Sequence, residues 1–369
     1  MVSFEMSDEQ KMVQETVASF ATDQIEPIMR ECDESETVPG EVIAKGWELG
    51  LLGGCIPEEY EGFGEEISAL TNQIALEELA WGDLSIALHL MAPSVLAISV
   101  LDQGTEEQKK QLLPLFCEEE YKAASCAVIE PYYNFCASAL KTTAVRDGEE
   151  YVINGSKCLV PLAQESGNLL VFATTTPGMG FSGVDAFIVP GGAKGMNIGE
   201  REKNMGVKAL STYPVTFKDC RVPTAARLGG SSGCDFLRVL SRSRLGLSAL
   251  AVGMSRRALE HSIDYATQRV AFGEPIGSRQ AIAFMIAEMA IEVDAARLLA
   301  WEAAWRCDNG IEFEKEAALA KNYAADTAMM VCDRGVQIMG GHGYVRDNPV
   351  ELWFRNARGF ASFEGFVMV

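Results

Sequence analysis

A few residues near the end of the chain have the types and spacing needed to bind a large cofactor and to move a proton. Arg269 and Phe272 stand in an Arg-Val-Ala-Phe-Gly run, and Gln337 is followed closely by a Gly-Gly pair. A guanidinium pairs well with phosphate, and glycine lets a backbone approach it closely. Glu364 follows among apolar residues. A partly desolvated carboxylate suits a general base, so this segment predicts proton abstraction.

The charge of the chain limits the partners that it can have. Its 369 residues carry 52 acidic and 31 basic side chains, a net charge of −21. Nucleic acid and anionic membrane surfaces would repel such a protein. We therefore expect no nucleic-acid partner. Any phosphate-binding site has to be a local basic pocket.

The cysteines and histidines indicate neither a metal site nor a disulfide framework. Ten cysteines fall at irregular spacings without a Cys-x-x-Cys motif, and there are only three histidines. The polar start, Met1–Asp8, does not resemble a secretory signal, so we expect reduced thiols and a cytoplasmic protein. The apolar stretch 84–101 is interrupted by His89 and Pro93, which favours a buried helix over a membrane span.

Hydrophobic periodicity divides the chain into three regions. Residues 1–120 read as helical, starting with a capping box at Ser7 and Gln10. A helix is expected over 69–91, with Glu77, Glu78 and Asp83 as its polar face. Residues 121–227 contain short β-branched runs between turn residues, which predict an antiparallel sheet; they are 142–145, 151–153, 169–174, 186–189 and 215–217.

Residues 228–369 return to helical spacing over 236–268, 280–309 and 312–339. Helices of this length favour a four-helix bundle. Helices, then strands, then helices, without βαβ alternation, give an α+β fold with three domains: 1–120, 121–227 and 228–369.

Motifs along nearly the whole chain resemble the acyl-CoA dehydrogenase family. They include Ile153-Asn-Gly-Ser-Lys157, Phe217-Lys-Asp-Cys-Arg-Val-Pro223, Arg269-Val-Ala-Phe-Gly273, Gln337-Ile-Met-Gly-Gly341 and Glu364-Gly365, all in the family's order. The resemblance implies an N-terminal helical domain, a middle β-domain and a C-terminal four-helix bundle. It also implies FAD as cofactor, an acyl-CoA substrate, an electron-transferring flavoprotein as partner, and a tetramer.

The same resemblance implies roles for individual residues. Glu364 is expected to be the base that removes the α-proton of the thioester, and Arg244 to contact coenzyme A. The ADP part of a neighbouring subunit's FAD is expected to contact a set of five residues: Arg269, Phe272, Gln337, Gly340 and Gly341. Four further residues are expected to line the substrate pocket: Met91, Phe135, Phe363 and Gly365.

The segments expected around the flavin ring depart from the family pattern. The resemblance places Val128, Ile129, Leu159, Val160, Pro161 and Phe366 there. Three of these stand where the family has hydroxyls, and Leu159 stands where it has tryptophan. Each lost hydrogen bond to a buried group costs about 1–3 kcal/mol, so we expect weaker FAD binding by this chain alone.

Three functions remain open from the sequence. The first is an acyl-CoA dehydrogenase that oxidises, or in reverse reduces, the Cα–Cβ bond. The second is an FAD-poor subunit of a hetero-oligomer, which completes the flavin site of a related chain. The third is a non-redox elimination or isomerisation on the same fold. The aromatic residues Tyr132, Tyr133 and Phe135 fit two interpretations, either accepting a cyclic acyl group or filling space left by the flavin.

Overall fold

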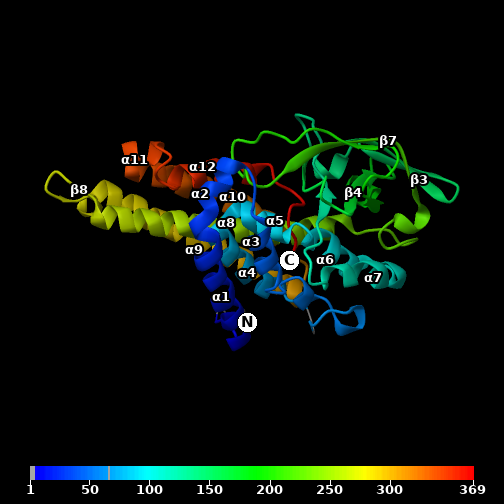
Figure 1. Cartoon of the computed structure of the whole chain (residues 1–369), viewed down its shortest axis with the longest axis horizontal. Coiled ribbons are helices and arrows are strands. Elements are labelled where there is room, and N and C mark those ends of the chain that lie inside the picture. Colours follow the sequence, from blue (N-terminus) through cyan, green and yellow to red (C-terminus); the bar gives the residue numbers. More distant parts are fainter. Residues whose placement is uncertain (1–4, 65–66) are drawn as a thin grey trace.

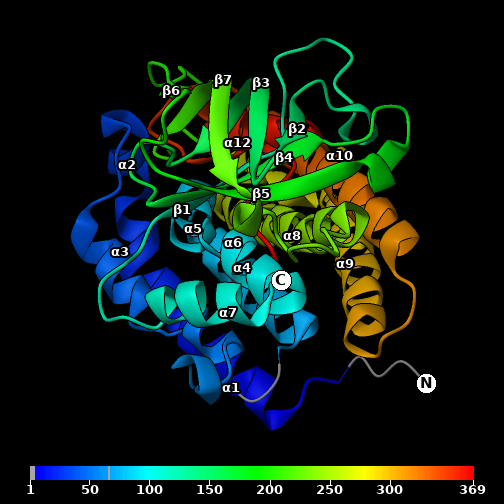
Figure 2. The same cartoon turned by 90° about the vertical axis from the view of Figure 1, so that its right-hand side faces the viewer.

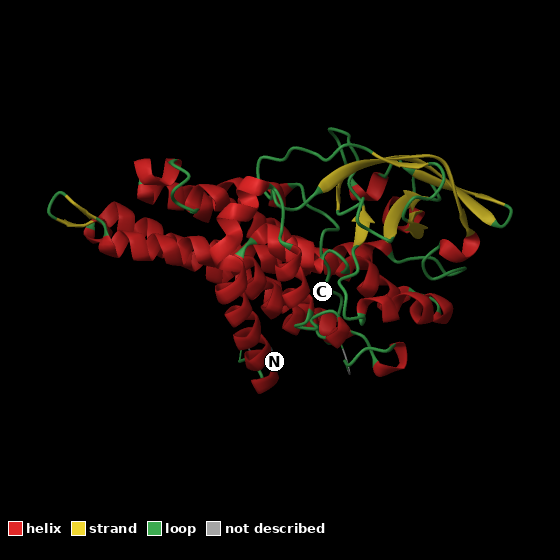
Figure 3. Ribbon diagram, in the orientation of Figure 1, coloured by secondary structure: helices red, strands yellow, loops and turns green. Residues whose placement is uncertain are grey.

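The computed structural model describes residues 5–64 and 67–369, and its elements follow the predicted order of helices, strands and helices along the chain. Most of the molecule is helical, and most of the strands gather at one end of it (Figure 3). The first region contains α1 (Asp8–Phe20), α2 (Met29–Ser35), α3 (Gly40–Trp47), α4 (Ala69–Gly82), α5 (Leu84–Met91), α6 (Ser94–Gln103) and α7 (Glu106–Leu112). The capping box at Ser7 and Gln10 is confirmed. In the described chain no single helix is long and apolar enough to cross a membrane; only the bent pair α5 and α6, taken together, reaches that length and composition.

Three long helices form the main body of the C-terminal region. They are α8 (Phe236–Gln268), α9 (Gln280–Asp308) and α10 (Glu314–Met339), followed by the short α11 (Gly341–Tyr344) and α12 (Val350–Ala357). The hairpin of β8 (Val270–Ala271) and β9 (Glu274–Pro275) connects α8 to α9. Figure 1 shows this hairpin and α11 at one end of the molecule and the large sheet at the other.

The middle region is a seven-stranded sheet that lies over α6 and α8 (Figure 2). Its strands are β1 (Ala124–Ala127), β2 (Thr143–Asp147), β3 (Glu150–Pro161), β4 (Asn168–Thr174), β5 (Val184–Pro190), β6 (Met196–Ile198) and β7 (Thr212–Pro223). Their order is β1-β4-β2-β3-β7-β6, and β5 also pairs with β4. Most pairs are antiparallel as predicted, but β1 and β2 both run parallel to β4, a pairing that local turn signals do not reveal.

The single helix predicted over 69–91 is two helices, α4 and α5, which meet at Asp83, and its predicted polar face lies in the interior. Glu77, Glu78 and Asp83 are all buried. Arg256 of α8 pairs with Glu77 at 2.9 Å and with Glu78 at 2.5 Å, while Asp83 caps α5 by accepting the N–H of Ile86 at 3.0 Å. The Glu77 and Glu78 pairs with Arg256 hold α4 against α8, since a charge is tolerated in the core when it is paired.

Strand β3 contains the irregularity that shapes the functional site. Its register against β7 shifts between Lys157 and Val160, and Leu159 has a φ of 52°. A positive φ is uncommon for a residue other than glycine. A bulge bends a strand and redirects its side chains. Here it places Leu159 in the wall of a cavity between the sheet and the C-terminal segment.

Candidate functional site

Glu364 lies in a tight turn after α12, between the sheet and the helices. The next residue, Gly365, has a φ of 76°, and a Cβ there would lie 2.5 Å from Cγ2 of Val128. Only glycine fits this position without strain. The Gly365 N–H donates to Oγ of Ser243 at 3.1 Å, which fixes the turn to α8. The local backbone therefore holds Glu364 in one place.

Two cations from different helices contact the Glu364 carboxylate. Arg244 of α8 donates from Nη2 at 3.0 Å and from Nε at 3.2 Å to Oε1. Nζ of Lys321, on α10, lies 4.0 Å from the same oxygen. The predicted base and the predicted coenzyme A contact thus form one ion cluster in this structure. Lys321 was missed from the sequence, although a lone lysine in an alanine-rich helix was the available signal.

An outer cavity of about 720 Å³ leads from the surface to this cluster. Glu364, Arg244 and Phe135 all line this cavity. Tyr133 at the cavity is fully exposed, and Lys141 stacks over Tyr132 at 3.7 Å. The volume lies within the roughly 300–1,000 Å³ typical of sites for small molecules.

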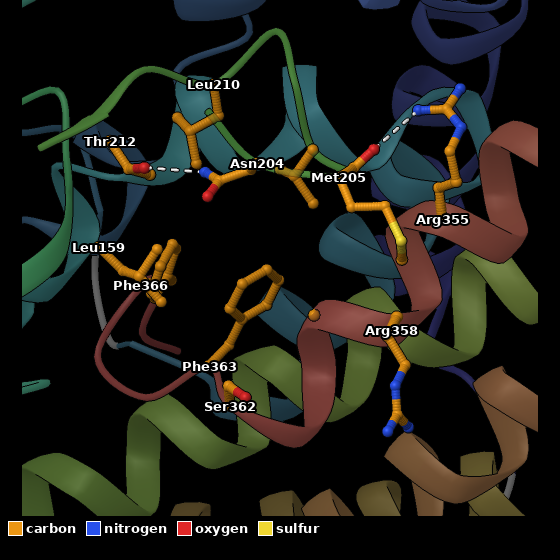
Figure 4. Close-up of a pocket in the computed structure, with 13 residues that line it drawn as sticks. Leu159, Asn204, Met205, Leu210, Thr212, Arg355, Arg358, Ser362, Phe363 and Phe366 are labelled. Atoms are coloured by element: carbon orange, nitrogen blue, oxygen red, sulfur yellow. Dashed lines mark hydrogen bonds between the residues drawn. The ribbon is translucent and has the colours of Figure 1, made fainter. Parts of the chain in front are cut away.

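A smaller inner cavity of about 200 Å³ lies next to it, between the β3 bulge and the C-terminal segment (Figure 4). Its walls include Leu159, Phe363 and Phe366. The rings of Phe363 and Phe366 pack with centroids 4.6 Å apart, and both side chains are buried. This volume is below the usual range for ligand sites, and the wall formed by Leu159, Phe363 and Phe366 is apolar.

The residues expected around a flavin ring are engaged within the chain instead. The carbonyl of Val128 accepts from Lys157 at 3.0 Å, that of Ile129 accepts the Cys158 N–H at 3.0 Å, and that of Pro161 accepts from Ser125. The Leu159 N–H donates to Glu202 at 3.0 Å. Val160 is buried in the sheet core.

The ring half of an FAD site therefore does not fit this arrangement. The inner cavity is small, the neighbouring backbone groups named above already have partners, and Phe366 fills space where the family has a hydroxyl residue.

The residues expected to bind ADP lie far from this cavity. Arg269 and Phe272 belong to the β8–β9 hairpin region, and Gln337, Gly340 and Gly341 lie at the junction of α10 and α11. Figure 1 shows both segments at the opposite end of the molecule from the sheet. Phe272 is 96% exposed, and Arg269, Gly340 and Gly341 are exposed. The structure thus brings the predicted cofactor residues together in two separate sets.

Met91 occupies neither cavity. It lies at the end of α5, buried in the helical core. The structure also contains no group of three or more potential metal ligands among its described residues.

Known proteins are similar to this chain in all three of its regions. Family models of the acyl-CoA dehydrogenase N-terminal, middle and C-terminal domains match residues 7–120, 125–220 and 235–366. Acryloyl-CoA reductase (NADH) of Anaerotignum propionicum is 36% identical over 99% of this chain and 93% of that protein.

Two solved structures are also similar. Butyryl-CoA dehydrogenase from Megasphaera elsdenii superimposes with a TM-score of 0.90, at 32% identity over 98% of this chain and 96% of that one. A chain from the structure that describes the electron-transferring flavoprotein of Acidaminococcus fermentans gives a TM-score of 0.89, at 35% identity over 98% and 95%. The chain belongs to the acyl-CoA dehydrogenase family.

Proposed function

We propose that this protein is an acyl-CoA dehydrogenase-type enzyme that acts on the Cα–Cβ bond of a short acyl-CoA thioester, with Glu364 as the base. The observation that carries the proposal is the Glu364 carboxylate, fixed by its turn and exposed to the 720 Å³ cavity beside Arg244. The relatives named acryloyl-CoA reductase and butyryl-CoA dehydrogenase support a three- or four-carbon acyl group.

The proton transfer follows from the chain's own residues. The α-proton next to a thioester is weakly acidic, so its removal needs a positioned carboxylate and a donor to the developing enolate oxygen. Within the described chain, the Glu364 N–H has no hydrogen-bond partner and is available as such a donor. Arg244 has to turn from Glu364 toward the incoming thioester, because a carboxylate held by a guanidinium is a weak base. The guanidinium then suits the anionic groups of coenzyme A.

A short acyl group is also favoured by the depth of the site. Neither cavity beside Glu364 includes a residue of α5 or α6, and the side chains of Met91, Val95 and Leu90 are buried against their neighbours. A long acyl chain would have to displace this packing.

The test is a Glu364→Gln variant. Exchange of the Cα protons of butyryl-CoA in D₂O, followed by NMR, should fall at least about 100-fold, the usual contribution of a general base. Glu312→Gln, at an exposed position, is the matched control and should exchange like the native protein. Native-like exchange in the Glu364 variant would refute the assignment.

A second candidate function is favoured by the poor fit of a flavin ring to the inner cavity. The inner cavity, lined by Phe363 and Phe366, is small, whereas the opposite end presents Arg269 and Phe272 to solvent. A chain of this kind can complete the flavin site of a related subunit without holding a flavin ring itself. The visible spectrum in excess FAD separates the candidates: a flavin band near one per chain supports the first, and no band supports the second.

The proposed function also implies a redox partner, an assembly and a cellular compartment. Because α,β-oxidation releases electrons, an electron-transferring flavoprotein is the proposed redox partner, supported by the solved structure from Acidaminococcus fermentans. The assembly is a homo-tetramer in the first candidate and a hetero-oligomer in the second. All ten cysteines are unpaired, which supports a reducing, cytoplasmic setting.

A further inference from the structure

Lys321 is an unusual residue for its place in the fold. It lies on α10, where Ala317, Ala320 and Ala324 around it are fully buried. Its side chain is only 7% exposed, and its ammonium group lies 4.0 Å from Oε1 of Glu364. Burying an ammonium is costly unless an opposite charge compensates it. Glu364 is the only acidic partner that Lys321 has in the described chain.

The two cations contact Glu364 from different directions. Arg244 lines the outer cavity, where an incoming thioester can reach it. Lys321 lines neither that cavity nor the inner one. An anionic substrate can therefore draw Arg244 away from Glu364 without removing Lys321.

We propose that Lys321 is a positioning residue, which keeps Glu364 ionised and fixed when the substrate engages Arg244. This inference rests on the proposed function of Glu364 as the base. With Arg244 turned away, the Glu364 carboxylate keeps an opposite charge beside it, because Lys321 lies 4.0 Å from its oxygen. Without Lys321, a largely buried carboxylate would have no cation beside it, which is unfavourable.

Other titratable groups face the same region and would contribute to any measured pH dependence. Cys136, from the loop after β1, and Cys158, from β3, both line the outer cavity, as does Tyr132. Hydrogen bonds from Ser138, with a smaller effect of Arg244, lower the pKa of Cys136. Burial raises the pKa of Cys158 to about 11. Glu130, also on this cavity, is neutralised by its own partner, Lys157.

The direct test compares Lys321→Met with Lys321→Arg over a range of pH. The rate of Cα–H exchange of butyryl-CoA in D₂O is measured from pH 5 to 9, with circular dichroism to check folding. In Lys321→Met the acid limb should move up by about one to three pH units, the effect of losing a charge 4 Å away at intermediate dielectric. Lys321→Arg should restore the native profile, and Lys315→Met, an exposed lysine on the same helix, should leave it unchanged.

The outcomes separate this inference from the proposed function. A rate that falls equally at all pH values in Lys321→Met, without a shifted limb, would overturn the role of Lys321 and leave Glu364 as the base. No exchange in the native protein at any pH would instead refute the proposed function.

A second readout does not depend on turnover. The carboxylic acid band of Glu364, identified by infrared difference against Glu364→Gln, is titrated in Arg244→Gln and in Arg244→Gln/Lys321→Met. A higher midpoint in the double variant supports the proposal, and equal midpoints overturn it. If Lys321→Met does not fold, Lys321→Gln replaces it in both measurements.

Discussion

The wall of the outer cavity depends on a fully buried ion pair, and breaking it should cost about 3 kcal/mol of folding free energy. Lys157 of β3 and Glu130 have side-chain exposures of 0% and 1%, and their charged atoms lie 3.1 Å apart. Lys157 also donates to the Val128 carbonyl at 3.0 Å. Glu130 accepts the N–H groups of Lys141 at 2.7 Å and Thr142 at 2.8 Å. The pair ties the β3 bulge to the segment that leads from β1 into the cavity.

Replacing Lys157 with Met keeps the volume but leaves the Glu130 carboxylate buried without a cation. Removing one partner of a buried pair typically costs about 3–5 kcal/mol, because the remaining charge is uncompensated. The two backbone donors to Glu130 stay, so we expect a loss near the lower end, about 3 kcal/mol. Urea unfolding followed by tryptophan fluorescence measures it as a lower midpoint at an unchanged slope.

A matched control lies in the same sheet. Arg221 of β7 pairs with Asp147 and Glu150 at 2.9 Å, but its side chain is 49% exposed. Arg221→Met should therefore cost at most about 1 kcal/mol. The double variant Lys157→Met/Glu130→Gln should regain part of the loss, since no buried charge remains. If Lys157→Met costs no more than Arg221→Met, the reasoning about the buried pair is wrong.

Two further predictions address the inner cavity and the helical core. Phe366→Thr should open the ring half of the site and tighten FAD binding at least about tenfold, since a buried hydrogen bond is worth roughly 1–3 kcal/mol. Fluorescence titration measures the FAD affinity. An affinity no better than that of the Phe360→Thr variant would contradict the prediction. Burial raises the pKa of Asp83 to about 7, so the folded protein keeps a proton that the unfolded chain releases above pH 4. Stability from this residue thus falls as pH rises from about 4 to 7, and Asp83→Asn should be more stable than the native protein by about 1–4 kcal/mol at pH 8 but not at pH 4. Thermal unfolding at the two pH values checks this, and an equal gain at both would rule out the titration.

The sequence predicted elements well where the determining signals are local. Helix α8 begins and ends at the predicted residues, because its hydrophobic spacing is continuous and a turn-forming segment follows it. The strands over 169–174 and 186–189 were found within one or two residues of their ends. Local periodicity reports the element, since the side chains that define it are neighbours in sequence.

The errors occur where partners are distant along the chain. Glu77 and Glu78 were assigned to the polar face of a helix and their burial was missed, because their partners Arg256 and Arg297 follow about 180 to 220 residues later. The same limit hid Lys321, which meets Glu364 only once α10 packs beside the C-terminal turn. Family motifs pointed to Glu364 and Arg244 separately, but not to Lys321 or to the contact between Arg244 and Glu364.

Proton transfer and hydride transfer, which a complete flavin enzyme carries out together, depend on different parts of this site. In the proposed function, proton transfer depends on Glu364, which the turn at Gly365 and the cations Arg244 and Lys321 hold in place in this structure. Hydride transfer needs an acceptor beside the substrate, and the cavity on that side, lined by Phe363 and Phe366, measures only about 200 Å³. Substitutions in the first group should change Cα exchange and leave FAD affinity alone, while Phe366→Thr should do the reverse. Exchange and flavin binding can therefore be scored independently, and a protein that exchanges Cα protons without binding FAD would be a base whose redox partner is another chain.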